Sequence, residues 1–329
     1  MALKKRLDFK EYTQGIFDGN KIILSKAITL LESSKKEDRD ISLALLKFAF
    51  PKTGKSFRIG ITGVPGSGKS TFIELLGQKY ISLGKKVAVL TIDPSSGLAK
   101  GSILADKTRM EELSKERDAF IRPSPAGMTL GGLHRCTRQA MLLCEAAGFD
   151  IILIETVGVG QSETVIKKLA DAVLLLMVTG TGDELQFIKK GIIEIADIIV
   201  VNKADEENVQ SAEMVSKEIQ ANISYQESDL WKVPVLTSSS LNIKSFDKIL
   251  SIIKLYETTL SNDNLIHKRR TENNIYWLHE LSKQYVIEDF YNSPKIISLI
   301  TNLEESLSND SIIPEEAADQ LLKIFKPIE

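Results

Sequence analysis

The eight residues Gly63-Val64-Pro65-Gly66-Ser67-Gly68-Lys69-Ser70 match the pattern GxxxxGK[ST] at every fixed position. They follow an apolar run, Ile59–Thr62, and lead into an amphipathic stretch that begins with Thr71. A strand, a glycine-rich turn and a helix in this order form a P-loop, whose main-chain N–H groups and helix N-terminus surround a phosphate. We therefore expect residues 63–71 to bind nucleotide phosphates, with Lys69 at the β- and γ-phosphates and Ser70 on Mg²⁺.

The rest of the chain supplies the strands that such a loop requires. From Arg58 onward, short apolar runs alternate with longer amphipathic stretches. Near-continuous apolar strands separated by helices predict an α/β fold, a P-loop NTPase with a mostly parallel sheet covered by helices on both faces. The expected strands are Arg58–Thr62, Val87–Ile92, Ile151–Ile154, Ala172–Val178, Ile198–Val201 and Val233–Leu236.

Two acidic residues come directly after expected strands. Asp93 follows Val87–Ile92, and Glu155 follows Ile151–Ile154. Ligands of parallel sheets gather at the carboxyl ends of strands, where a carboxylate can hold Mg²⁺ directly or through water. The polar segment after Asp93 adds Asp106 as a further candidate contact. The predicted metal ligands are Ser70, Asp93, Asp106 and Glu155, and the predicted catalytic group is Lys69, Asp106 and Glu155.

The base site is predicted by Asn202-Lys203-Ala204-Asp205, which follows the apolar run Ile198–Val201. The carboxylate of Asp205 can accept hydrogen bonds from guanine N1–H and the exocyclic amine, whereas adenine presents an acceptor at N1 and leaves the carboxylate unpaired. The stem of Lys203 can lie over the base, and Asn202 can connect neighbouring loops. We expect a main-chain N–H of Ser238 or Ser239 to meet guanine O6. GTP and GDP are the predicted ligands, and GTP hydrolysis is the predicted activity.

Both ends of the chain are helical in pattern, because apolar residues recur at helix spacing before residue 57 and strand patterns stop after about Asn262. We expect an N-terminal helical extension over residues 1–57, a P-loop GTPase domain over residues 58–261 and a C-terminal helical extension over residues 262–329.

Composition excludes several other classes. The net charge of −2 gives no electrostatic reason to expect nucleic acid as a partner. No apolar run approaches the roughly 20 residues of a membrane span, and the N-terminus lacks the apolar core of a signal peptide. Cys136 and Cys144 are read as small buried hydrophobic residues. We expect a cytoplasmic protein.

Several longer stretches resemble the MeaB-type GTPases, the chaperones of adenosylcobalamin-dependent methylmalonyl-CoA mutase and related acyl-CoA mutases. The resemblance covers nearly the whole chain. The most specific stretches are Asp93-Pro94-Ser95-Ser96, Glu155-Thr156-Val157-Gly158-Val159-Gly160-Gln161-Ser162-Glu163 and Gly182-Asp183-Glu184-Leu185-Gln186.

The resemblance implies roles that motif spacing alone does not give. It implies slow, partner-stimulated GTP hydrolysis by a chaperone that gates adenosylcobalamin loading on a mutase and protects or reactivates it. Residues 94–110 and 156–163 would be two switches. Residues 179–191 would be a third, coupled to the mutase through Asp183, Gln186 and Lys189. The C-terminal helices, around Arg269, Arg270 and Trp277, would form a homodimer contact.

The sequence departs from the family pattern in places. Lys100 and Ala105 stand where glycines are expected in the first switch, and Phe187 replaces a glycine in the third. None of these changes removes a predicted phosphate or base ligand. Considered by itself, Arg269-Arg270 is read as a solvated basic pair.

Two alternatives remain open: a P-loop kinase that phosphorylates a small molecule, and a nickel-enzyme maturation GTPase. The NKxD sequence and the lack of an evident acceptor pocket argue against the kinase. The lack of a Cys- or His-rich segment argues against the nickel protein.

Overall fold

The computed structural model describes residues 6–33, 35–92, 110–125, 128–156, 163–180, 192–223, 230–240 and 244–325. The chain divides into two compact units, Met1–Thr271 and Glu272–Glu329. Asp93, Asp106, Asp183, Gln186 and Lys189 lie outside the described residues, as do Lys100, Ala105 and Phe187.

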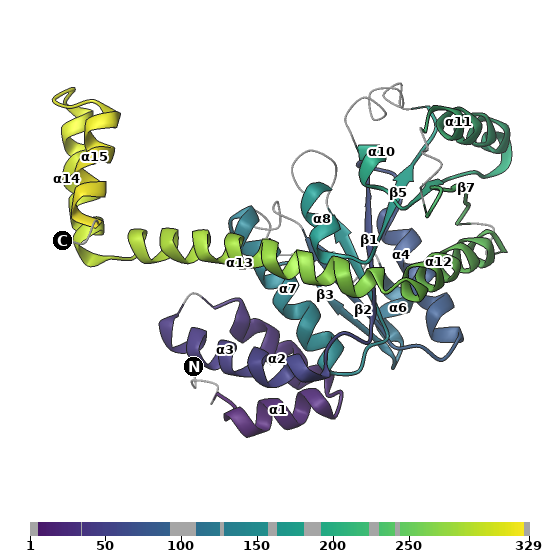
Figure 1. Ribbon diagram of the computed structural model, residues 1–329, viewed down its shortest axis with the longest axis horizontal. Helices are drawn as coiled ribbons and strands as arrows, with labels where there is room; N and C mark the ends of the chain where they lie inside the picture. The colour runs from purple at the N-terminus through teal and green to yellow at the C-terminus, as the bar shows by residue number, and fades with distance from the viewer. Residues whose placement is uncertain are drawn as a thin grey trace. The chain divides into compact units, whose positions relative to one another are not determined.

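The first unit is built on a seven-stranded sheet in the order β3-β2-β4-β1-β5-β6-β7, with every neighbouring pair parallel (Figure 1). The strands are β1 (Phe57–Gly63), β2 (Val87–Ile92), β3 (Ala119–Arg122), β4 (Ile151–Thr156), β5 (Ala172–Met177), β6 (Ile198–Val201) and β7 (Val235–Thr237). The predicted parallel α/β fold is confirmed, and so are six of the strands. Sequence reasoning missed β3, because its apolar run is only Ala119-Phe120-Ile121, between the charged residues Asp118 and Arg122.

Helices cover both faces of this sheet, which explains why every residue of β2, β4, β5 and β6 is buried. On one face, Ile59 and Ile61 share a core with α4 (Lys69–Ser82), α6 (Glu111–Lys115) and α12 (Lys244–Asn262). The other face is covered by α7 (Leu130–Ala146), α8 (Glu163–Leu169), α10 (Ile192–Ile195) and α11 (Val209–Asn222). A Cβ on Gly60 would lie 2.4 Å from Ile166, so this glycine lets α8 approach β1 closely.

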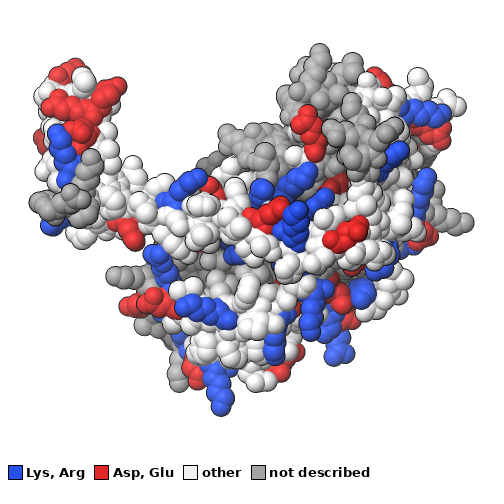
Figure 2. All heavy atoms as spheres, in the orientation of Figure 1, with Lys and Arg blue, Asp and Glu red and all other residues white. Residues whose placement is uncertain are grey.

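The surface carries charges of both signs. Figure 2 shows basic and acidic side chains interspersed over the described part of the visible face. Among the described helices, none is both long and apolar enough to cross a bilayer.

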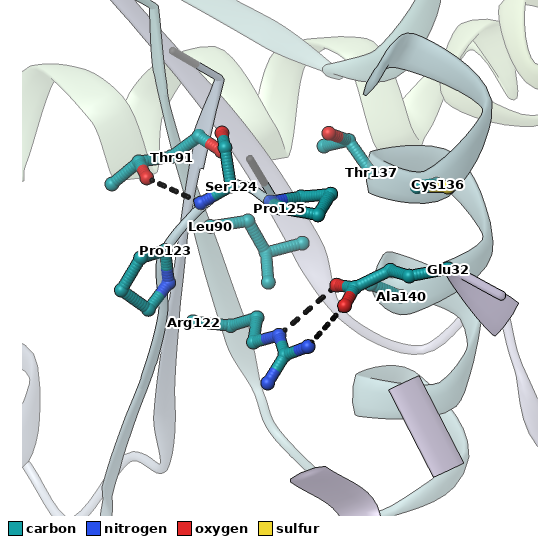
Figure 3. Close-up of a pocket in the computed structure, with 10 residues that line it drawn as sticks. All are labelled: Glu32, Leu90, Thr91, Arg122, Pro123, Ser124, Pro125, Cys136, Thr137 and Ala140. Atoms are coloured by element: carbon teal, nitrogen blue, oxygen red, sulfur yellow. Dashed lines mark hydrogen bonds and ion pairs between the residues drawn. The ribbon is translucent and has the colours of Figure 1, made fainter. Parts of the chain in front are cut away.

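Three N-terminal helices, α1 (Phe9–Phe17), α2 (Lys21–Leu31) and α3 (Lys36–Ala49), precede the sheet, followed by the short η1 (Phe50–Lys52). Asp8 and Glu11 form a capping box at the start of α1, which satisfies two main-chain donors. Helix α2 packs against α7. Arg122, at the end of β3, donates to both carboxylate oxygens of Glu32, just after α2 (Figure 3). Burial raises the pKa of Glu32, and Arg122 opposes that change. This ion pair fastens the N-terminal helices to the edge strand.

The first turns of α13 (Leu265–Tyr291) are anchored at the amino end of the sheet, opposite the end that carries the P-loop. The guanidinium of Arg270 donates to both oxygens of Asp171, at 2.8 and 2.6 Å, and to the carbonyls of Gly54 and Ser56. Arg269 donates to the hydroxyl of Tyr256 at 2.7 Å. The reading of these two arginines as a solvated pair is therefore wrong for Arg270, whose side chain is 15% exposed, whereas the side chain of Arg269 is 42% exposed. A pair of adjacent basic residues does not reveal that the partners of Arg270 lie about a hundred residues or more away.

The second unit contains the rest of α13 together with α14 (Pro294–Ser308) and α15 (Pro314–Phe325). Helices α14 and α15 pack together, and the rings of Phe290 and Phe325 meet edge to face at 5.0 Å. Many large apolar side chains of this unit are exposed: Ile275, Leu278, Val286, Ile287, Tyr291, Ile297, Ile313, Leu322, Ile324 and Phe325.

Replacing Arg270 with methionine tests the anchor. The change leaves the carboxylate of Asp171, whose side chain is only 2% exposed, without its main partner. Breaking a buried ion pair in this way costs about 3–5 kcal/mol. We expect the urea midpoint of Arg270→Met, followed by circular dichroism, to fall accordingly. Lys268→Met, at an exposed position on the same helix, is the control and should change the midpoint little. Equal midpoints for the two variants would contradict the anchor.

Candidate nucleotide-binding site

The predicted strand, glycine-rich turn and helix are all present, with residues 63–68 connecting β1 to α4. Gly63, Gly66 and Gly68 have φ values of 150°, 80° and 83°, which side chains disfavour. A Cβ on Gly63 would also lie 2.2 Å from the carbonyl oxygen of Leu176. The loop therefore needs glycine for its backbone conformation and, at Gly63, for space as well.

Lys69 is folded over the loop. Its Nζ donates to the carbonyls of Gly63 and Val64, both at 3.0 Å. Burial lowers the pKa of Lys69, and the nearby carboxylate of Glu155 opposes that shift. The ammonium group is thus directed into the cradle that the glycines form, where a phosphate would be its natural partner.

Ser70 and Glu155 come together as predicted from their motifs. The hydroxyl of Ser70, in the first turn of α4, donates to Glu155 Oε1 at 2.9 Å, next to the end of β4. A hydroxyl and a carboxylate oxygen are donors that Mg²⁺ prefers. The described residues contain no group of three or more acidic, histidine or cysteine side chains able to hold a metal. The pair fits a Mg²⁺ ion bound with nucleotide phosphates, because Mg²⁺ in such sites usually takes one or two protein ligands.

Asn202, just after β6, connects the predicted base site to the P-loop. Its Nδ2 donates to the carbonyl of Ser67 at 2.8 Å, and its Oδ1 accepts from the hydroxyl of Ser238 at 2.8 Å. A Cβ on Gly68 would lie 2.9 Å from Asn202 Nδ2, so the third glycine makes room for this bridge. Lys203, the next residue, adopts a left-handed backbone with φ 59°.

Asp205 presents an acceptor without a donor. Its Oδ1 atom is buried and has no hydrogen-bond partner in the described part of the chain. A buried polar atom of this kind is costly unless a ligand satisfies it. Guanine offers two adjacent donors on one edge, which is what a carboxylate can accept.

The two serines after β7 differ from one another. The N–H of Ser238 donates to Val201 in the sheet, so Ser238 contributes through its hydroxyl on Asn202. The N–H of Ser239 donates to Ser245 Oγ at the longer distance of 3.3 Å, and it stays the candidate for guanine O6. Thr71 lies exposed in the first turn of α4. Sequence reasoning did not foresee the role of the Ser238 side chain, because nothing in Thr-Ser-Ser distinguishes a hydroxyl contact from a main-chain one.

A sequence model described as methylmalonyl Co-A mutase-associated GTPase MeaB matches residues 24–295. The chain belongs to the MeaB family. The match includes the P-loop, Asn202–Asp205 and the anchored start of α13, and it confirms the resemblance drawn from the motifs.

Three relatives extend this result. GTPase ArgK of Escherichia coli is 41% identical over 83% of both chains. The methylmalonic aciduria type A homolog of mouse, a mitochondrial protein, is 38% identical over 95% of this MeaB-family chain and 78% of its own. A crystal structure named LAO/AO transport system kinase has a TM-score of 0.74 and 31% identity, and covers 99% of this chain and 100% of its own.

Exchanging Asp205 for asparagine tests the base reader. The amide presents a donor where guanine also presents donors, so we expect the affinity for GDP to fall roughly a hundredfold, since hydrogen bonds to a charged group are worth about 1.5–3 kcal/mol each. Xanthosine diphosphate, which has a carbonyl in place of the exocyclic amine, should bind Asp205→Asn better than GDP does. Isothermal titration calorimetry measures both. An unchanged preference for GDP would contradict the assignment of Asp205.

Removing the Ser238 hydroxyl tests the hydrogen bond by which Ser238 holds the side chain of Asn202. Ser238→Ala should weaken GDP binding roughly fivefold, because Asn202 loses a hydrogen bond worth about 1 kcal/mol. Ser251→Ala, which removes a hydroxyl bonded only within α12, is the matched control and should bind GDP like the unaltered chain. Equal affinities for all three proteins would show that Asn202 keeps its position without Ser238.

Proposed function

We propose that this MeaB-family protein binds GTP and GDP with Mg²⁺, hydrolyses GTP slowly, and gates adenosylcobalamin loading on an acyl-CoA mutase that it protects or reactivates. The observation that carries the nucleotide assignment is the unpartnered Asp205 Oδ1 beside Asn202, which bonds the P-loop. The family description supports methylmalonyl-CoA mutase, or a relative of it, as the client. The name of the mouse relative fits the same client.

Hydrolysis proceeds by attack of water on the γ-phosphorus, which breaks the bond to the β–γ bridging oxygen and yields GDP and phosphate. Lys69 and the main-chain N–H groups of the P-loop stabilise the charge on the phosphate oxygens. Ser70 and Glu155, together with Asp93 and Asp106, would hold Mg²⁺. When bound, Mg²⁺ neutralises charge on the β- and γ-phosphates. Asp106 and Glu155 orient water, and no residue is assigned as a general base. The nucleotide state reaches the mutase through Asp183, Gln186 and Lys189.

The exposed apolar side chains of the second unit support a homodimer. Large contiguous apolar patches are uncommon on monomers and mark interaction surfaces. We assign this surface, defined by the side chains of the second unit given above, to contact with a second copy of the chain.

The proposed activity is tested by phosphate release from GTP, with and without purified methylmalonyl-CoA mutase. We expect slow release that requires Mg²⁺ and rises roughly fivefold or more with the mutase, the scale of ordinary coupling between sites. Asp205→Asn should abolish the stimulation of phosphate release by the mutase at the same GTP concentration. Release that instead requires a small-molecule acceptor would favour a kinase, in line with the name of the related crystal structure. If the protein binds the mutase with neither GTP nor GDP, the proposal that the mutase is its client is contradicted.

The homodimer is tested by light scattering on the full-length chain. Ile275→Glu combined with Leu278→Glu introduces two charges at side chains that are 56% and 63% exposed. We expect the mass to halve, because a charge buried in an interface without a partner costs several kcal/mol. Lys283→Glu, a charge reversal on the same helix, should leave the mass unchanged. A monomeric unaltered chain would contradict the proposal.

A further inference from the structure

We propose that the hydroxyl groups of Thr62 and Thr156 form a positioning pair that sets the Glu155 carboxylate for the Mg²⁺ ion of the nucleotide site. The hydroxyl of Thr156 donates to that of Thr62 at 2.9 Å. Both residues are completely buried. Neither residue belongs to the predicted phosphate, metal or base ligands. This inference rests on the proposed function, because it concerns how the same site holds its metal.

The pair lies at the carboxyl ends of three neighbouring strands, β1, β4 and β2, next to the nucleotide site. Thr62 immediately precedes Gly63, the first residue of the P-loop, and Thr156 immediately follows Glu155. In the sheet, Ile61 is the partner of Glu155, and Ile92 on β2 is the partner of Thr156. The hydroxyl bond therefore joins β1 and β4 one residue beyond their last paired positions.

The two threonines act from the face of the sheet opposite to the metal ligands. Side chains alternate along a strand, so Glu155, which reaches Ser70 on α4, and Thr156 point to opposite faces. Gly60, two residues before Thr62, shares its face, and that face meets Ile166 and Ala170 at α8. The bond thus restrains the main chain at residues 155–156 on the α8 face of the sheet. On the α4 face, Glu155 bonds Ser70.

The chemistry of the two side chains favours this role over simple packing. Valine would fill the same volume and suits a buried strand equally well. A buried hydroxyl adds a cost of desolvation that it recovers only by hydrogen bonding. What the two hydroxyls add is a directed bond between neighbouring strand ends, which fixes the spacing between the P-loop strand and the strand that carries Glu155.

The experiment compares Thr156→Val, Thr62→Val, the double variant and Thr156→Ser. GDP bearing a fluorescent group reports nucleotide dissociation over a range of Mg²⁺ concentrations and in EDTA. We expect each valine variant to raise the Mg²⁺ concentration needed for half-maximal slowing of GDP release roughly fivefold, the scale of one lost hydrogen bond. GDP release in EDTA should be unchanged. Thr156→Ser should stay within about twofold, and the double variant should resemble either single one, because both remove the same bond.

Thr13→Val is the matched control, since it removes a buried hydroxyl bonded only within α1. It should leave the Mg²⁺ requirement unchanged. If the valine variants keep the Mg²⁺ requirement of the unaltered chain and lose only thermal stability, the pair is structural and the inference is overturned. If Thr156→Val does not fold, Thr62→Val decides the question alone. If the unaltered chain binds GDP without any influence of Mg²⁺, the proposed metal site fails first, and that result is distinct from failure of the pair.

Discussion

The side chain of Asn202 holds the two halves of the nucleotide site together. It donates to the carbonyl of Ser67, 135 residues earlier in the chain, and accepts from Ser238, 36 residues later. A nucleotide spans a limited distance between its phosphates and its base, so the P-loop and the predicted base-binding residues must be held at a defined separation. Gly68 belongs to the same arrangement, because a side chain there would collide with the Asn202 amide. The glycine pattern of the P-loop and the asparagine of the base motif are thus parts of one contact.

The two ends of the central strand serve different purposes. At its carboxyl end, β1 delivers the P-loop and meets β4 through Thr62 and Thr156. At its amino end, Arg58 bonds Glu145 of α7 at 2.5 Å, while the Arg58 N–H donates to Asp171. Arg270 also bonds Asp171 and so belongs to this network at the amino end of the sheet. The first turns of α13 are therefore part of the GTPase core, and they attach to the end of the sheet opposite the P-loop.

The sequence predicted what local patterns determine. Continuous apolar runs predicted six strands, and two motifs predicted the residues that meet at the carboxyl edge. It did not predict β3, since an apolar run of three residues between two charged ones gives little pattern. Nor did it predict the burial of Arg270, whose partners depend on the assembled fold. The Thr62–Thr156 bond was missed for a related reason. Threonine at the end of a strand is common, and only the register of β1 against β4 brings these two together.

The buried carboxylates show why the orphan atom of Asp205 indicates a ligand. Glu145 accepts from Arg58 and from the N–H of Gly54, and Asp171 accepts from Arg270 and Arg58. Asp38, whose Oδ1 has no hydrogen bond of good geometry, still lies 2.7 Å from the guanidinium of Arg6. The fold thus supplies these acids with a donor or a nearby positive charge. Asp205 Oδ1 has neither in the described structure, although its neighbours in the motif are tightly bonded. An acceptor that the described residues leave unsatisfied favours a donor from outside the chain, and in the proposed function the edge of guanine would supply one.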